Sequence, residues 1–298
     1  MLNIEKYGAI DIGSNAIRLL IVTIIEQEGK ETKFKKTSLI RVPIRLGADV
    51  FVNGEVSEAS YLRMVDSFKA FQLLMKTHNV FKYRACATSA MREAKNSKTI
   101  VKKLLETTGI KINIINGNDE AKIIASTDLK AYLVHDTTFL YVDVGGGSTE
   151  LTIYSEGKTV ASKSFKMGTV RLINNLVDDI MWDQMKDWIT NNTRNYNYIT
   201  LLGTGGNINS TYKFSGKKTG TPLSYRYLVT YFNKVKALSY DDRIFELDMN
   251  PDRADVIIPA LKIYIFAMKW SGAEYVYVPK IGLSDGIIRS LYNEKLNS

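Results

Sequence analysis

The feature of this sequence that most restricts its fold is a motif that occurs twice. Residues 9–22 read AIDIGSNAIRLLIV, and residues 141–154 read YVDVGGGSTELTIY. In both segments an Asp, a β-branched residue and a Gly precede three small or polar residues, and alternating apolar residues follow. The sequence separation between Asp11 and Asp143 is not far from half of the length of the 298-residue chain. The repeat predicts two halves of similar topology, each opening with two antiparallel strands joined by a tight glycine turn.

The segments after these two hairpins are also alike. KKTSLIRVPIRLG (35–47) has a looser counterpart in ASKSFKMGTVRLI (161–173), so each half is expected to add a third antiparallel strand. Further strands, such as YRACATSA (83–90) and YITLLG (198–203), alternate with helical patterns. This alternation predicts an α/β fold with mixed sheets, with a domain boundary near residues 126–137.

Several helices can be delimited from their capping residues. Ser57 is expected to cap a long amphipathic helix that turns four apolar side chains inward, namely Leu62, Val65, Phe68 and Leu74. A second helix is expected to begin at Ser97 and to end at Gly109. The remaining predicted elements are helices at 118–133, 178–191, 225–238 and 252–270, a last helix from Ser284, and strands at 110–115 and 274–281.

The charge balance indicates what kind of partner the chain attracts. Forty Lys and Arg residues against thirty-one Asp and Glu residues give a formal net charge of +9. This excess favours polyanions, but the basic residues are dispersed and form no block of the kind that binds nucleic acid. A groove or mouth for a small polyphosphate is therefore expected, with no specific nucleic-acid partner.

One cysteine, Cys86, excludes an internal disulfide framework and favours a reducing, cytoplasmic location. It lies in an apolar strand, where a buried structural thiol is expected rather than a nucleophile. The first residues show no pattern typical of a signal peptide. The most apolar stretch, residues 256–268, is too short to span a bilayer and contains Pro259 and Lys262, so a buried helix and no membrane association are expected.

The residues of the two glycine turns are suited to binding phosphate. Consecutive backbone N–H groups in a tight turn form a concavity for anions, and glycine lets the backbone approach an oxygen closely. The candidate phosphate-binding residues are Gly13, Ser14 and Asn15 in the first turn and Gly145, Gly146, Gly147 and Ser148 in the second. A β-turn without a ligand explains either motif alone, but the repetition weakens that interpretation.

Charged residues flank both turns. Asp143 precedes the second turn and Glu150 follows it, and such hard oxygen ligands suit Mg²⁺ or another divalent cation. Arg18 takes the place of Glu150 in the first repeat, and Arg92 follows the segment ATSAM. Both guanidinium groups are candidate phosphate ligands, with a structural salt bridge as the alternative. The sequence contains neither a GxxxxGK[ST] motif nor a GxSxG motif, which excludes a Walker-type nucleotide site and a serine-hydrolase elbow.

Seven segments occur in an order that resembles the exopolyphosphatase / guanosine pentaphosphate phosphohydrolase phosphatase family. They are DIGSNAIRL (11–19), ATSAMREA (87–94), INGNDEAKII (115–124), DVGGGSTEL (143–151), GTGGN (203–207), DRADVI (252–257) and GLSDGII (282–288). The match runs from about residue 7 to residue 290 and is similar to the short, two-domain type of the family. It implies an α/β fold with two actin-like domains of the sugar kinase/chaperone ATPase superfamily (ribonuclease H-like), with mixed sheets around an interdomain cleft. The implied domains are residues 1–130 and 131–298, and the last helix is a candidate to pack back on the first.

The resemblance also implies roles for individual residues. Glu120 matches the proposed base that activates the catalytic water, and Glu150 matches a second catalytic acid that shares the metal site with Asp143. The glycine-turn residues, Arg18 and Arg92 match phosphate-binding positions. Asp119 replaces a family Glu, and the alternative role for Glu120 is a helix N-terminal carboxylate that complements the helix dipole.

The implied reaction is hydrolysis of the terminal phosphoanhydride of inorganic polyphosphate. Guanosine pentaphosphate is the alternative substrate. A small-metabolite kinase of the same fold and a nucleotide-sensing scaffold without catalysis are the rival interpretations, and the set of acids and arginines favours hydrolysis over both. Formation of a homodimer is implied by the resemblance alone.

Overall fold

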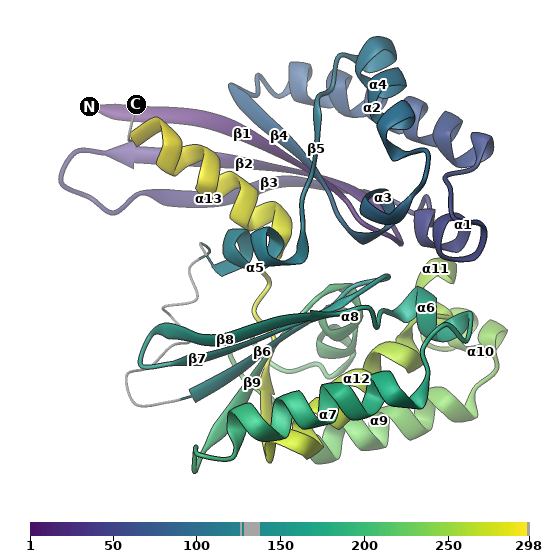
Figure 1. The fold of residues 1–298 in the computed structure, drawn as a ribbon. Helices are drawn as coiled ribbons and strands as arrows, with labels where there is room; N and C mark the ends of the chain where they lie inside the picture. The colour runs from purple at the N-terminus through teal and green to yellow at the C-terminus, as the bar shows by residue number, and fades with distance from the viewer. Residues whose placement is uncertain (126, 128–137, 297–298) are drawn as a thin grey trace. The chain divides into compact units, whose positions relative to one another are not determined.

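The computed structural model describes residues 1–125, 127 and 138–296. The chain divides into two compact units, Met1–Thr127 with Ile281–Ser298, and Asp128–Lys280 (Figure 1). The chain therefore leaves the first unit after Thr127 and returns to it at Ile281. Each unit contains one mixed sheet, as the sequence predicts for an α/β fold.

The sheet of the first unit has five strands in the order β3-β2-β1-β4-β5. Three antiparallel strands, β1 (Leu2–Ile12), β2 (Ile17–Gln27) and β3 (Lys33–Val42), form the predicted meander. β4 (Lys82–Ala87) is parallel to β1, and β5 (Ile112–Ile114) is parallel to β4. The predicted strand 83–90 ends early, because helix α3 (Ser89–Glu93) begins within it.

Helix α2 (Glu58–Thr77) covers one face of this sheet together with α1 (Leu46–Asn53) and α4 (Ser97–Thr108). Its predicted cap is confirmed, since the Ser57 side chain accepts a hydrogen bond from Ser60 N. The prediction that Leu62 points inward is wrong, because this side chain is 54% exposed. Leu62 shares its helix face with the exposed Asp66 and Lys69, whereas the buried stripe runs through Tyr61, Met64, Val65, Phe68, Phe71 and Met75.

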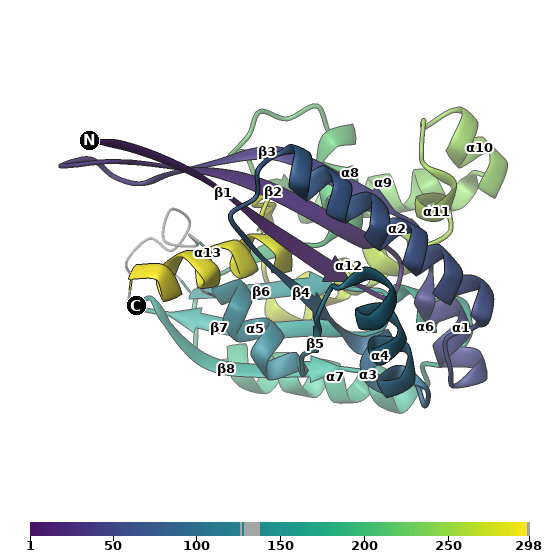
Figure 2. The same cartoon turned by 90° about the horizontal axis from the view of Figure 1, so that it is seen from above.

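The opposite face of the sheet carries two helices, α13 (Leu283–Leu296) and α5 (Gly117–Ala125) (Figures 1 and 2). The predicted helix 118–133 is confirmed in its first part, and its remainder lies outside the described residues. Helix α13 contacts β1, β2 and β4, so the last helix of the chain belongs to the core of the first unit.

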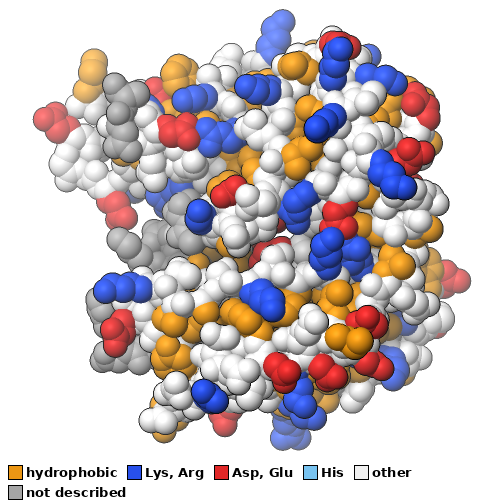
Figure 3. All heavy atoms as spheres, viewed as in Figure 1, with side chains coloured by type: hydrophobic (Ala, Val, Ile, Leu, Met, Phe, Trp, Pro, Cys, Tyr) orange, Lys and Arg blue, Asp and Glu red, His pale blue; other side chains and the backbone are white. Residues whose placement is uncertain are grey.

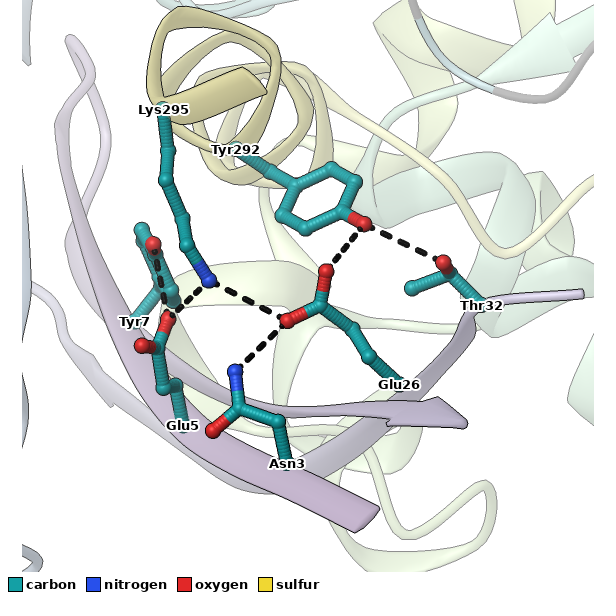
Figure 4. Close-up of polar contacts among 7 residues, drawn as sticks. All are labelled: Asn3, Glu5, Tyr7, Glu26, Thr32, Tyr292 and Lys295. Atoms are coloured by element: carbon teal, nitrogen blue, oxygen red, sulfur yellow. Dashed lines mark hydrogen bonds and ion pairs between the residues drawn. The ribbon is translucent and has the colours of Figure 1, made fainter. Parts of the chain in front are cut away.

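Polar contacts hold the end of α13 on the strands (Figure 4). Lys295 Nζ donates to Glu5 Oε2 at 2.9 Å and to Glu26 Oε2 at 3.1 Å. Tyr292 Oη donates to Glu26 Oε1 at 2.7 Å. The hydrogen bonds from Tyr292 and Lys295 lower the pKa of Glu26, and those to Glu5 and Glu26 raise the pKa of Lys295.

The second unit repeats the strand order of the first. Strands β8-β7-β6-β9-β11 correspond to β3-β2-β1-β4-β5, and β10 (Leu223–Ser224) extends the sheet beyond β11. The antiparallel part consists of β6 (Thr138–Val144), β7 (Thr149–Ser155) and β8 (Lys158–Phe165). β9 (Ile199–Thr204) and β11 (Tyr275–Tyr277) are the parallel strands. The duplication predicted from the two motifs is confirmed.

Helices of the second unit enclose its core. The elements are α6 (Thr169–Ile173), α7 (Asp179–Thr193), α8 (Gly206–Phe214), α9 (Tyr225–Ala237), α10 (Tyr240–Phe245), α11 (Pro251–Ala254) and α12 (Ile257–Ser271). The apolar stretch 256–268 forms most of the buried helix α12, as predicted. Among the described residues, no helix is both long and apolar enough to cross a bilayer. The predicted strand 274–281 is shorter, since β11 ends at Tyr277, and Pro279, which has no N–H group to donate, follows two residues later.

Basic side chains follow the dispersed pattern that the sequence predicts. On the face drawn in Figure 3, Lys and Arg side chains are spread out and interleaved with acidic and apolar ones. Several basic residues also have structural partners, as Arg84 does with Glu294 at 2.8 Å. On this face the basic side chains therefore form no single basic block.

Replacing Lys295 with Met tests how α13 is held. The variant keeps the aliphatic stem but leaves Glu5 and Glu26 without their shared cation, so we expect the free energy of unfolding to fall by about 1 kcal/mol at pH 7. Because the pKa of Glu26 is lowered, this contribution is present above its ordinary value of 4.5 and is lost as the pH falls through the lowered pKa. Urea unfolding of both proteins between pH 3 and pH 8 measures this difference. A difference that stays constant across that range would contradict the assignment.

Candidate functional site

The two glycine turns have the same backbone geometry. Gly13 N donates to Ala16 O at 3.1 Å, and Gly145 N donates to Ser148 O at 2.9 Å. The strands on either side keep the same register, with Asp11 opposite Arg18 in the first unit and Asp143 opposite Glu150 in the second. Directly opposed residues project from the same face of a sheet, so each turn has a pair of charged side chains beside it.

In the second unit this pair belongs to a row of four polar residues, which we call the acidic row. Strand register aligns Thr204 of β9, Asp143 of β6, Glu150 of β7 and Ser164 of β8 on one face. Glu150 is only 4% exposed, and its Oε1 accepts hydrogen bonds from Ser148 Oγ at 2.6 Å and Ser164 Oγ at 3.0 Å. The two hydroxyls fix this carboxylate immediately after the glycine turn.

The corresponding residues of the first unit form the basic row, Cys86, Asp11, Arg18 and Arg41. Arg18 Nη1 lies 3.2 Å from Asp11 Oδ2, an ion pair of the kind considered as the structural alternative for Arg18. Burial raises the pKa of Asp11, and the charge of Arg18 opposes this shift. Arg18 stands where Glu150 stands in the second unit, as the repeat predicts, so the two rows carry opposite charges.

Arg41 is a residue that the sequence analysis missed. The comparison of residues 35–47 with 161–173 sets Arg41 against Met167, whereas the strand register sets it against Ser164. The difference arises because β2, β3 and the connection between them are all longer than their counterparts β7, β8 and the β7–β8 connection. A register shift between Ile21 and Val22 also interrupts the alternation of side chains, so counting from Arg18 does not locate Arg41.

The carbonyl groups of the second glycine turn are bound by the start of α6. Thr169 N donates to Gly145 O at 3.0 Å, and Val170 N donates to Gly146 O at 2.8 Å. The buried side chain of Arg171 completes the set, because its Nε donates to Gly147 O at 2.8 Å. Among the described residues, no protein acceptor bonds the N–H groups of Gly146 and Gly147. Such a turn offers its N–H groups to an anion.

The first turn is held in the same way by the start of α1. Gly47 N donates to Ser14 O at 2.7 Å, and Arg45 N donates to Asn15 O at 3.0 Å. Ser14 is buried. The duplication therefore extends from the strands to the contacts that shape the two turns, and Gly13, Ser14 and Asn15 lie together as predicted.

Glu120 and Arg92 both belong to the first unit. Glu120 lies in the first turn of α5 and is 9% exposed. Asn116 holds the start of this helix, since its Oδ1 accepts from Asp119 N at 2.9 Å and its carbonyl accepts from Glu120 N at 3.0 Å. Arg92 Nη1 donates to Ile115 O at 2.7 Å, so Arg92 fixes the chain directly before α5. This contact is a structural hydrogen bond to a backbone carbonyl group and not the salt bridge considered as the alternative for Arg92.

The pKa of the Cys86 thiol depends on carboxylates that lie near it. Burial raises the pKa of Cys86 to about 11, opposed by Arg84 and reinforced by the charges of Asp11 and Glu120. Cys86 is buried, as the sequence predicts, and its raised pKa disfavours the thiolate form that a nucleophile requires. Asp11 and Glu120 are brought into the same neighbourhood of the first unit.

The acidic row fits a metal ion that keeps part of its own coordination shell. Within the described residues, no three His, Cys, Asp or Glu side chains gather to hold a metal. Asp143 and Glu150 supply two carboxylates, and Mg²⁺ typically binds one or two together with water and substrate phosphate oxygens. Bare backbone borders Asp143, since a Cβ on Gly205 (φ +107°) would lie 3.1 Å from Asp143 Oδ1. The donor set therefore suits Mg²⁺ bound with substrate, and not an all-protein cage.

Comparison with known proteins assigns the chain to one family. Residues 24–295 match the model of the Ppx/GppA phosphatase family. Exopolyphosphatase 1 of Mycobacterium tuberculosis is 22% identical over 306 aligned residues, which cover 95% of this chain and 87% of that protein. The guanosine-5'-triphosphate,3'-diphosphate pyrophosphatase of Aliivibrio fischeri is 30% identical over 177 residues, which cover 58% of this chain and 34% of that protein. The chain thus spans about a third of the length of the curated relatives that it matches at 30% identity.

A solved structure supports the fold. The crystal structure of an exopolyphosphatase from Cytophaga hutchinsonii superposes with a TM-score of 0.84 at 21% identity, over 97% of this chain and 98% of that chain. At this identity the likeness concerns the fold, and it confirms the two-domain α/β fold implied by the sequence resemblance.

Replacing Gly168 with Ala tests how the second glycine turn is shaped. A Cβ at Gly168 would lie 2.3 Å from Gly146 O, so the turn has to move. We expect the free energy of unfolding to fall by about 1–3 kcal/mol and pyrophosphate binding, measured by calorimetry, to weaken at least about tenfold. Gly282→Ala is the control, because its Cβ meets no heavy atom within 4 Å. Unchanged pyrophosphate binding in Gly168→Ala would show that the turn does not hold the anion.

Proposed function

Because the chain belongs to the Ppx/GppA phosphatase family, we propose that it is a phosphohydrolase that removes the terminal phosphoryl group of inorganic polyphosphate. The observation that carries the proposal is the second glycine turn. Its carbonyl groups are bound by α6 and Arg171, while the N–H groups of Gly146 and Gly147 are not used by any described protein acceptor. A buried carboxylate, Glu150, follows directly. A phosphoanhydride hydrolase needs both hydrogen-bond donors that bind the anionic substrate and carboxylate groups.

The phosphate-binding role is assigned to both turns and to two arginines. In the second turn the backbone N–H groups of Gly146 and Gly147 bind phosphoryl oxygens beside Ser148, and Ser14 and Asn15 do so in the first. The N–H groups of Gly13 and Gly145 instead close the two turns and so give them their shape. Arg18 is 34% exposed at its side chain, so its guanidinium remains accessible while Nη1 pairs with Asp11. Arg92 has a structural bond to Ile115 O through Nη1, and its remaining N–H groups are proposed to bind substrate. These donors offset the charge that develops on the phosphoryl oxygens.

Glu120 is proposed as the base that orients and deprotonates the attacking water. Its position in the first turn of α5 is fixed by the Asn116 cap and by Arg92, as a general base requires. Phosphoryl transfer needs little covalent chemistry from the protein, so a positioned carboxylate and charge stabilisation are sufficient. Glu150 is the second proposed catalytic acid, held by Ser148 and Ser164.

Mg²⁺, or another divalent cation, is proposed to bind at Asp143 and Glu150. When bound, the ion would neutralise charge on the phosphoryl oxygens. The residues of the chain itself position the carboxylate and the phosphate. Ser148 and Ser164 hold Glu150 in place, and the glycine turn orients the phosphate.

Polyphosphate is proposed in preference to guanosine pentaphosphate because the exopolyphosphatase relative aligns with 95% of this chain, against 58% for the pyrophosphatase relative. Guanosine pentaphosphate is the second candidate, supported by the higher identity of 30% in the part that aligns.

The same proposal includes a cytoplasmic location, for which the single reduced Cys86 is the support, and a homodimer, which light scattering tests.

The decisive experiment is a phosphate-release panel with Mg²⁺ and either short polyphosphate, long polyphosphate, guanosine pentaphosphate or ATP. We expect turnover of polyphosphate, and Glu120→Gln is expected to lower kcat at least about 100-fold while KM stays near that of the wild type. Asp119→Asn is the matched control, since this neighbouring acid of α5 is half exposed and serves the helix cap. Formation of ADP from ATP without free phosphate, and only in the presence of an acceptor, would indicate a kinase. Near-normal kcat in Glu120→Gln would remove this residue from the role.

The metal assignment has its own test. Chelation with EDTA is expected to abolish phosphate release, and added Mg²⁺ is expected to restore it. Asp143→Asn removes one of two proposed carboxylate ligands, so the Mg²⁺ concentration for half-maximal activity should rise at least about tenfold. Direct titration with Mn²⁺ followed by electron paramagnetic resonance measures the same change without turnover. Asp183→Asn, an exposed acid on α7, is the control, and an equal response of both variants would contradict the assignment.

A further inference from the structure

The helix that carries Glu120 packs against α13 at a point where no side chain fits. A Cβ built on Gly286 of α13 would lie 2.1 Å from Ile123 O and 2.7 Å from Ile123 C, both backbone atoms of α5. Cβ atoms essentially never approach another heavy atom within 3.0 Å, so any residue other than glycine would force the helices apart by about 1 Å. At Gly168 the corresponding distance to Gly146 O is 2.3 Å.

Helix α13 is fixed on the sheet along its whole length. Near its start, Asp285 Oδ1 pairs with Lys36 Nζ of β3 at 2.7 Å, and the Arg289 guanidinium lies 3.6 Å from the centre of the Phe34 ring. Further along, Arg84 Nη2 pairs with Glu294 at 2.8 Å, and Tyr292 and Lys295 bond to β1 and β2 (Figure 4). These anchors come from four strands of one sheet, so α13 resists displacement.

Helix α5 is shorter than α13 and packs against it. It has nine residues and is too short to be stable without tertiary contacts. Asn116 caps its beginning, and Arg92 bonds the carbonyl group that precedes it. Among the described elements, α5 packs most extensively on α13. Because four strands anchor α13, we expect a clash at Gly286 to be relieved by a movement of α5.

A movement of α5 reaches Glu120 directly. Ile123 lies one turn after Glu120 on the same helix, so the two move together as parts of a rigid segment. We propose that Gly286 is a positioning residue, which seats α5 on α13 and so sets the place of the Glu120 carboxylate. This inference rests on the proposed role of Glu120 as the base. A misplacement of about 1 Å at a catalytic group can cost about 100-fold in rate, and part of the shift at Ile123 reaches Glu120.

Gly286→Ala tests the inference in the full-length protein, with Gly282→Ala as the matched control. Both variants add one methyl group within a few residues of each other, but only the first meets the α5 backbone. With short polyphosphate and Mg²⁺, we expect Gly286→Ala to lower kcat about 10- to 100-fold with KM unchanged, after correction for the folded fraction measured by circular dichroism. Gly282→Ala is expected to keep the wild-type kcat. Lys295→Met loosens α13 far from Gly286 and controls for lower stability alone.

A double-mutant cycle distinguishes an effect of Gly286 on the position of Glu120 from an unspecific loss of activity. If Gly286 acts through Glu120, adding Gly286→Ala to Glu120→Gln lowers kcat no further. An additive loss, or a wild-type kcat in Gly286→Ala, would overturn the inference. A wild-type kcat in Glu120→Gln alone would instead overturn the proposed function.

Should Gly286→Ala not fold, Asp285→Asn is the second variant. It removes the ion pair with Lys36 beside Gly286 and keeps an acceptor for Gly282 N. We expect a several-fold loss of kcat that again disappears in the Glu120→Gln background. An unchanged kcat in this variant would count against the inference.

Discussion

The register of the strands at the two glycine turns is the constraint on which the rest of the structure depends. The bond from Gly13 N to Ala16 O and that from Gly145 N to Ser148 O fix where each hairpin turns. A slip of one residue would move Asp11, Arg18, Asp143 and Glu150 to the opposite face of their sheets. The opposite faces are the apolar cores, where Ile10, Ile12, Val142 and Val144 lie. Burial of those side chains thus holds the charged rows in place, because an uncompensated buried charge is costly.

The two halves share this strand arrangement but differ in the charged side chains at corresponding positions. In the first unit Arg18 and Arg41 occupy the positions that Glu150 and Ser164 occupy in the second. Cations in one row and acids in the other are the two kinds of group that the proposed hydrolysis requires, one for phosphate and one for a metal ion. The turn contacts have been kept, since α1 binds the carbonyl groups of the first turn as α6 binds those of the second. A duplicated strand arrangement with changed side chains can supply both kinds of group without a second fold.

The sequence predicts the hairpins, the duplication and most helices because these follow from short-range patterns. The Ser57 cap and the glycine turns are local, and the structure confirms them. Leu62 was placed wrongly because its spacing from Val65 suits either side of the buried stripe, and only the packing of Tyr61 and Met64 decides. Arg41 was missed since its partner across the sheet depends on the lengths of β2 and β3, on their connection and on the register shift between Ile21 and Val22.

Local sequence patterns do not predict features that depend on segments far apart in the chain. The bond from Arg171 to Gly147 O and the close approach of Gly286 to Ile123 join residues that no periodicity relates. The role of Glu120 came from a family resemblance, because a carboxylate in the first turn of a helix is also what the helix dipole alone favours. Strand register and side-chain burial, which decide such cases, exist only in the folded chain.

The position of α13 has a consequence for how the first unit forms. Its sheet is complete by β5, but α5 follows at the end of that segment and is too short to hold itself in place. The helix that packs along it comes from residues 283–296, after the whole second unit in the chain. The contact between Gly286 and Ile123 closes a very long loop, and such contacts form late because loop closure has to precede them. We therefore expect the Glu120 helix to become ordered late in the folding of this unit, and the hydrogen-bonded anchors of α13 on β1 and β2 stabilise the folded arrangement.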